Sequence, residues 1–133
     1  MGREVIFRGK RTDNGEWVYG NLVRYPSRKG EWTKSSEIWD FDSEGEHYWV
    51  VNPETVGEFT GLFDKNGKEI YEGDIIRFCD DPPYCSDYIV KYDDERLIWI
   101  ADGVGDFMDD LWELGCGDFV RVIGNIHDDP EML

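Results

Sequence analysis

The acidic segment "DGVGDFMDDLWE", residues 102–113, holds the side chains best suited to chemistry in this chain of 133 residues. On a helix, Asp106, Asp110 and Glu113 would lie three or four residues apart and so share one face. Carboxylate oxygens in that arrangement suit Mg²⁺ or Ca²⁺, which makes a metal-dependent enzyme one hypothesis. The simpler interpretation is a solvated polar helix face, because runs of charge are usually surface. We favour the simpler interpretation and predict no metal site.

A second acidic segment, "DFDSEGEHYWVV", begins like a calcium-binding loop. Asp40, Asp42 and Glu44 occupy alternate positions, and Gly45 stands at the sixth. The twelfth position of such a loop needs a glutamate that binds through both oxygens, and this chain has Val51 there. The segment is therefore interpreted as an acidic turn.

The histidines and cysteines give no further site. His47 and His127 are far apart in the sequence, and the spacing of Cys79, Cys85 and Cys116 matches no common metal or redox motif. We predict no cofactor, no catalytic residue and free, buried thiols. A bridge between Cys79 and Cys85 is the alternative, disfavoured because a cytosolic protein keeps its thiols reduced.

Charge is the dominant bulk property, with a formal net charge of −16. Residues 1–51 hold 8 Lys/Arg and 9 Asp/Glu, whereas residues 52–133 hold 6 and 21. Such a surface repels nucleic acid and anionic membranes and attracts basic protein surfaces. Neither an apolar run of about 18 residues nor a signal-peptide core is found, so we expect a cytoplasmic protein.

Two similar stretches organise the chain: "DNGEWVYGNLVR" begins at Asp13, and "KNGKEIYEGDIIR" begins at Lys65. Each contains Asn-Gly, which favours a β-hairpin with a type I′ turn because both residues tolerate positive φ. A glycine follows each tyrosine, at Gly20 and Gly73, where a strand would bulge or bend. Glu72 is an insertion in the second copy, which is otherwise aligned with the first.

The remaining pattern predicts a mainly β protein. Strand-like runs are "EIWDF", "HYWVV", "DYIVKY", "RLIWIA" and "FVRVIGNI", and "CDDPPYCSD" is expected to be a long loop. One short helix is expected in "DFMDDLWELG", with Asp106 as N-cap and Gly115 just past its end. We predict two small, related barrel-like subdomains, Met1–Val51 and Asn52–Leu133, packed together.

The chain also resembles a known family. The stretches "FRGKRTDNGEWVYGNLV", "NPETVGEFTGLFDKNGKEIYEGDIIRF" and "VIGNIHDDPEML" are together similar to the YopX family of phage and prophage proteins, from Ile6 to Leu133. The block Thr55–Phe78 is the most specific part, and the closing "GNIHDDPEML" is a second match. The resemblance implies a small, mostly β protein encoded by phages, without an assigned molecular function and without catalytic residues to carry over.

These observations favour a non-enzymatic, phage-encoded accessory protein in the bacterial host cytoplasm. We expect its acidic half to bind a basic surface of a host or phage protein that handles DNA, as a mimic of DNA phosphates. Direct binding of nucleic acid or membrane is disfavoured. The alternatives are a structural, self-assembling homo-oligomer and the metal-dependent enzyme considered above. The candidate partner-binding residues are Asp93, Asp94, Glu95, Asp106, Asp109, Asp110 and Glu113.

Overall fold

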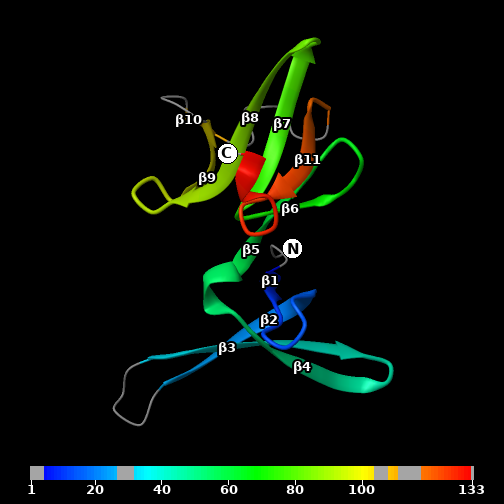
Figure 1. The fold of residues 1–133 in the computed structure, drawn as a ribbon, viewed down its shortest axis with the longest axis vertical. Coiled ribbons are helices and arrows are strands. Elements are labelled where there is room, and N and C mark those ends of the chain that lie inside the picture. Colours follow the sequence, from blue (N-terminus) through cyan, green and yellow to red (C-terminus); the bar gives the residue numbers. More distant parts are fainter. Residues whose placement is uncertain (1–4, 27–31, 104–107, 111–117, 133) are drawn as a thin grey trace. The chain divides into compact units, whose positions relative to one another are not determined.

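A computed structural model describes residues 5–26, 32–103, 108–110 and 118–132 of the chain (Figure 1). The chain divides into two compact units, Met1–Phe59 and Thr60–Leu133, and the division falls within one strand. The described residues form antiparallel strands joined by tight turns, with only short 3₁₀ turns besides. The predicted mainly β fold is confirmed.

Unit 1 is a curled sheet with the strand order β4-β3-β2-β1-β5. Its core contains Val18, Ile38 and Val51, against which Phe7, Leu22, Trp49 and Val56 pack. An isolated bridge between Arg11 and Val51 joins the end of β1 to the end of β4. The strands are β1 (Phe7–Lys10), β2 (Trp17–Pro26), β3 (Trp32–Asp42), β4 (Gly45–Val51) and, after the 3₁₀ turn η1 (Pro53–Thr55), β5 (Gly57–Phe63).

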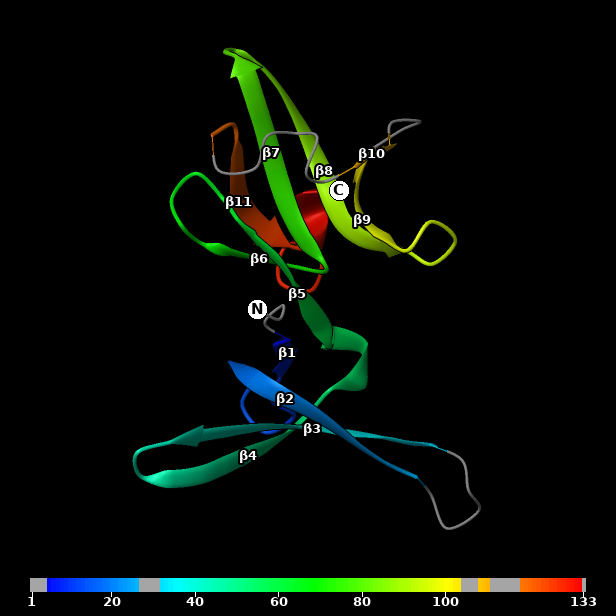
Figure 2. The same ribbon diagram turned by 180° about the vertical axis from the view of Figure 1, so that it is seen from behind.

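Unit 2 contains a sheet with the strand order β10-β9-β8-β7-β11, preceded by the short strand β6, which lies next to β5. Its core contains Ile70, Ile76, Tyr88, Val90, Ala101 and Val120. In both views, β7 and β8 form a long two-stranded ribbon (Figures 1 and 2). The elements are β6 (Glu69–Tyr71), β7 (Asp74–Asp81), β8 (Tyr84–Asp93), β9 (Ile98–Gly103), β10 (Met108–Asp110), β11 (Val120–Asn125) and the 3₁₀ turn η3 (Pro130–Met132).

Both Asn-Gly sites form the predicted hairpins, β1–β2 and β5–β6, but the predicted turn type is wrong. A type I′ turn needs positive φ at both central residues. Outside glycine, the described residues show positive φ only at Leu97, so neither Asn14 nor Asn66 adopts it. Gly15 and Gly67 do, at 74° and 79°. The loops are longer than two residues, so glycine alone occupies the left-handed position.

The two copies diverge after their tyrosines because of the inserted Glu72. In unit 1, β2 runs on through Gly20, where its pairing passes from β1 to β3. A Cβ at Gly20 would lie 2.2 Å from the carbonyl oxygen of Trp39, so only glycine fits. In unit 2, Glu72 and Gly73 form a turn that ends β6 before β7 begins. In both copies the glycine stands where the chain changes its partner strand.

The predicted helix is wrong where the structure describes it. Met108–Asp110 form β10, which pairs with Ile100–Asp102 of β9. The other residues of the predicted helix, including Asp106 and Glu113, lie outside the described residues. A short apolar pattern does not separate helix from strand, and the edge of β9 offers backbone hydrogen-bonding groups that the sequence pattern does not reveal.

The cysteine prediction is also corrected, because Cys79 and Cys85 form a disulfide. They lie directly opposite each other in the β7–β8 ladder, with Cα atoms 4.4 Å apart. The Cys79 N–H donates away from β8, to the Phe119 carbonyl, so this is a non-hydrogen-bonded pair, whose side chains lie closest. The expected loop "CDDPPYCSD" is thus the end of a hairpin, with its turn at Pro82 and Pro83.

The disulfide predicts a thiol count. Denatured, unreduced protein should take up one alkyl group, and reduced protein should take up three, because two of the three cysteines are bonded. Mass spectrometry of the alkylated chain measures this count. Three alkyl groups on protein that was purified without reductant would contradict the pairing.

Asp64 links the turn of the β5–β6 hairpin to β11 through hydrogen bonds. The residue is 3% exposed. Its Oδ1 accepts hydrogen bonds from the backbone N–H groups of Asn66 and Lys68, and its Oδ2 accepts one from Val122 at 3.0 Å. Burial raises the pKa of this carboxyl, but the hydrogen bonds from these three N–H groups and the nearby charge of Lys68 outweigh burial and lower the pKa overall.

We predict that Asp64→Asn lowers the free energy of unfolding by about 1–3 kcal/mol, measured by urea denaturation at neutral pH. An amide nitrogen cannot accept a hydrogen bond, so at least one buried N–H group would face another donor. The control is Asp13→Asn in the other hairpin, where the side chain is 64% exposed. It should cost at most about 0.5 kcal/mol.

The pH dependence follows from the lowered pKa of Asp64. Ionised Asp64 stabilises the folded state fully at pH values above its unfolded pKa of about 3.9. This stabilisation is lost as the pH falls through its lower, folded pKa. The stability difference between wild type and Asp64→Asn should therefore shrink in acid. A difference that stays constant from neutral to acidic pH would contradict this assignment.

Candidate functional site

The predicted acidic surface is described at five of its seven residues. Asp93 ends β8, and Asp94 and Glu95 lie in the turn that leads to β9. Asp109 and Asp110 belong to β10, which pairs with β9. Across the sheet, Asp110 lies opposite Ile100, which in turn lies opposite Lys91 of β8. Asp93 and the two aspartates of β10 thus belong to one sheet, but β9 lies between their strands, so they are separated by about two strand spacings of 4.8 Å.

Asp93 has a structural role within this group. One carboxylate oxygen accepts hydrogen bonds from the N–H groups of Glu95 and Arg96, and the other accepts one from the Arg96 guanidinium at 2.8 Å. The Arg96 side chain, together with these N–H groups, lowers the pKa of Asp93 despite its partial burial. Asp93 therefore shapes the turn, whereas the side chains of Asp94 and Glu95 are exposed.

Within the described residues, three basic side chains of unit 2 bind carboxylates of the same unit. Arg77 binds Asp87, Lys91 binds Asp102 and Arg96 binds Asp93, at 2.6 to 2.8 Å. Residues 60–133 hold 19 Asp/Glu against 6 Lys/Arg, a balance of −13, whereas residues 1–59 hold 11 against 8, a balance of −3. The excess of negative charge thus belongs to unit 2.

The structure contradicts the helix on which the hypothesis of a metal site at Asp106, Asp110 and Glu113 depended. A face shared with Asp106 and Glu113 required a helix, and Asp110 lies in a strand. Within the ranges that the structure describes, no group of three or more His, Cys, Asp and Glu residues is placed to hold a metal ion. The same residues include no helix that is long and apolar enough to cross a membrane.

The two most specific sequence motifs meet in unit 2, a contact that sequence reasoning missed. The Ile126 N–H donates to the Gly73 carbonyl, and Asn125 pairs with Asp74 across β11 and β7. The Asp74 carboxylate is buried and accepts the Tyr71 N–H at 2.8 Å. These contacts join the end of β11 to the start of β7 and to the turn before it. No pattern within either motif indicates this pairing.

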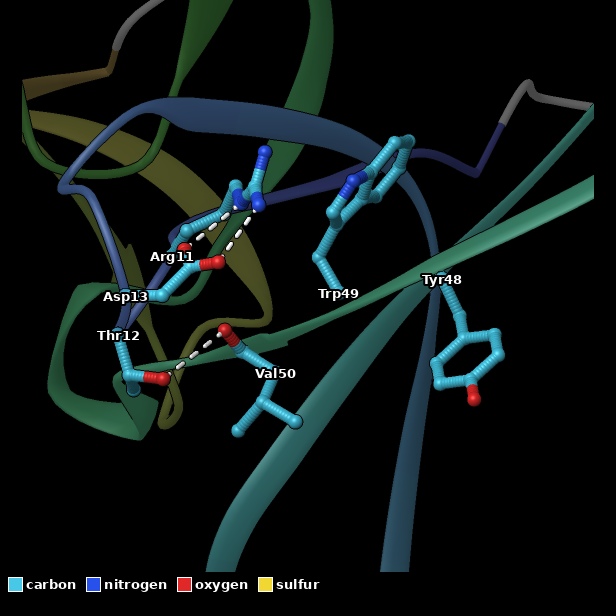
Figure 3. Close-up of a pocket in the computed structure, with 6 residues that line it drawn as sticks. All are labelled: Arg11, Thr12, Asp13, Tyr48, Trp49 and Val50. Carbon is cyan, nitrogen blue, oxygen red and sulfur yellow. Dashed lines mark hydrogen bonds and ion pairs between the residues drawn. The ribbon is translucent and has the colours of Figure 1, made fainter.

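Unit 1 has a hollow with a volume of about 260 Å³, beside β4 and the β1–β2 turn (Figure 3). Two of its lining residues are joined by the Thr12 N–H, which donates to the Val50 carbonyl at 3.0 Å. Two others form an ion pair, in which Arg11 binds Asp13 at 2.6 Å and lowers the pKa of that carboxyl. This hollow could not be predicted from the residue pattern, because the turn and β4 are far apart along the chain. It is lined by Arg11, Thr12, Asp13, Tyr48, Trp49 and Val50.

The chain was compared with solved structures, curated proteins and protein families. It is similar to the crystal structure of protein EF1440 from Enterococcus faecalis, with 23% sequence identity, a TM-score of 0.58 and coverage of 99% of each chain. That likeness concerns the fold. No curated protein matches the chain. A protein family described as "YopX protein" matches residues 6–133, nearly the whole sequence. The chain therefore belongs to the YopX family.

Proposed function

We propose that this protein is a phage- or prophage-encoded accessory protein that binds other proteins in the cytoplasm of a bacterial host and catalyses no reaction. Its partner carries a basic surface, such as that of a host or phage protein that handles DNA. The acidic residues of unit 2 would take the place of DNA phosphates at that surface. The phage context comes from the family resemblance, and the nature of the partner comes from the charge.

The charge of unit 2 is the observation that supports this proposal. Arg77, Lys91 and Arg96 already bind carboxylates of their own unit, so they do little to offset the remaining negative charge. Exposed carboxylates outside those pairs include Asp94, Glu95 and Asp118. A field of this sign steers a cationic partner toward the surface and repels nucleic acid.

The buried carboxylates support a binding role over catalysis. Asp64 and Asp74 are 3% and 2% exposed, and both accept backbone N–H groups. A general acid or base must reach the proton that it transfers, and these carboxylates are turned toward the backbone of their own unit. The carboxylates that a partner can reach lie on the surface, where charge complementarity determines binding.

The test is a charge reversal at the exposed turn residues, Asp94→Lys with Glu95→Lys, leaving Asp93 to hold the turn. The matched control is Glu54→Lys with Glu131→Lys, which makes the same change in net charge at exposed residues outside that turn. Tagged proteins are used to capture partners from bacterial lysate, and the captured protein is identified by mass spectrometry and then purified.

Wild type and control should bind the purified partner alike, and the turn variant should bind about tenfold or more weakly. Binding should also weaken with added salt, since the Debye length is about 10 Å at 0.1 M. Equal binding by the turn variant and the wild type, or a partner without a basic surface, would refute the proposal.

A further inference from the structure

Strand β4 ends its sheet, and its outward groups can be assigned from one contact. The Thr12 N–H donates to the Val50 carbonyl, so Val50 directs its backbone groups away from β3. In an antiparallel ladder the N–H and C=O of one residue point the same way, and the direction alternates along the strand. Glu46 and Tyr48 therefore also direct their N–H and C=O groups away from β3.

The side chains confirm this assignment. Trp39 lies opposite Tyr48, and their rings stack with centroids 4.8 Å apart. Close side chains are expected for a non-hydrogen-bonded pair, in which both residues bond outward. The β1–β2 turn covers the edge only at its end, where Thr12 meets Val50 and Asn52 donates to Lys10. Among the strands that the structure describes, only β3 pairs with the part of β4 before Val50.

The hollow lies beside this edge. Tyr48, Trp49 and Val50 line one side of it, and the turn residues Arg11 to Asp13 line the other (Figure 3). Figure 3 shows the rings of Tyr48 and Trp49 on opposite sides of β4, as expected for neighbouring residues of a strand. A strand added along β4 would bring alternate side chains toward the hollow.

The charge beside the edge is negative at both ends. At the hollow, Arg11 is 2.6 Å from Asp13 and 3.9 Å from Glu16, whose side chains are 64% and 71% exposed. One guanidinium thus meets two carboxylates. At the other end, the exposed Glu44 and Glu46 flank the β3–β4 turn. A second copy of the chain would bring like charges to this edge, whereas a lysine- or arginine-bearing segment would complement them.

We propose that the open edge of β4 binds an extended segment of a partner protein that carries lysine or arginine. The segment adds a strand to unit 1, with backbone hydrogen bonds to Tyr48 and Glu46 and one side chain in the hollow. This site is separate from the acidic surface of unit 2.

The probe is a capped peptide of alternating lysine and valine, with a peptide of alternating glutamate and valine as its counterpart. The lysine peptide should bind the full-length protein in a titration and slow hydrogen exchange of the Tyr48 amide, observed by NMR. The glutamate peptide should do neither.

Two substitutions at one position isolate the backbone contribution. Tyr48→Ala removes the ring and keeps the N–H, whereas Tyr48→Pro also removes the outward N–H. Proline is tolerated on an edge strand where its nitrogen faces solvent, so the β3–β4 ladder should remain. The proline variant should bind the lysine peptide about tenfold more weakly than the alanine variant. A loss of the circular dichroism of the sheet would identify misfolding.

A second variant tests charge without altering the strand. Asp13→Asn with Glu16→Gln should weaken binding of the lysine peptide and reduce its preference over the glutamate peptide. Equal binding by the proline and alanine variants, or equal binding of both peptides to the wild type, would overturn the proposal. A wild-type dimer that Tyr48→Pro converts to monomer would also overturn it, because a second copy would then occupy the edge.

Discussion

A buried carboxylate in the turn of the β5–β6 hairpin links the most specific sequence motif, Thr55–Phe78, to the distant strand β11. Asp64 accepts N–H groups from its own turn and from Val122, which is 58 residues away in sequence. Buried backbone N–H groups need an acceptor, and an ionised carboxylate is a strong one. The position of β11 beside the hairpin, and with it the start of the family's closing motif, depends on this interaction.

The repeated motif shows how one residue changes the path of a chain. Both copies make a hairpin at Asn-Gly and then reach a glycine after the tyrosine. Without an insertion, β2 continues straight from one partner strand to the next, and Gly20 allows a close approach to Trp39. With Glu72 inserted, the chain turns and starts a new strand. Local turn chemistry is thus reused, while the larger path differs.

Acidic residues in this protein have two roles, which burial separates. Asp64, Asp74 and Asp93 accept backbone N–H groups and hold turns in place. Asp94 and Glu95 lie on the surface of the same unit and contribute to its negative electrostatic field. In unit 1, Arg11 is balanced by two carboxylates beside an open strand edge. Among the described residues, the fold therefore combines an acidic surface on unit 2 with a strand, β4, that ends its sheet in unit 1.

By itself the sequence determined the mainly β fold, the two hairpins and the concentration of negative charge after residue 51. These properties depend on the alternation of side chains within a strand, on turn preferences and on a count of charges, all of which are local. Only the tertiary structure decided that Met108–Asp110 form a strand, that Cys79 faces Cys85, that Asp64 is buried and that β4 ends its sheet. The burial of Asp64 depends on Val122, 58 residues away, and the other three depend on which strands pair and in which register. Side-chain patterns along the chain do not specify these pairings.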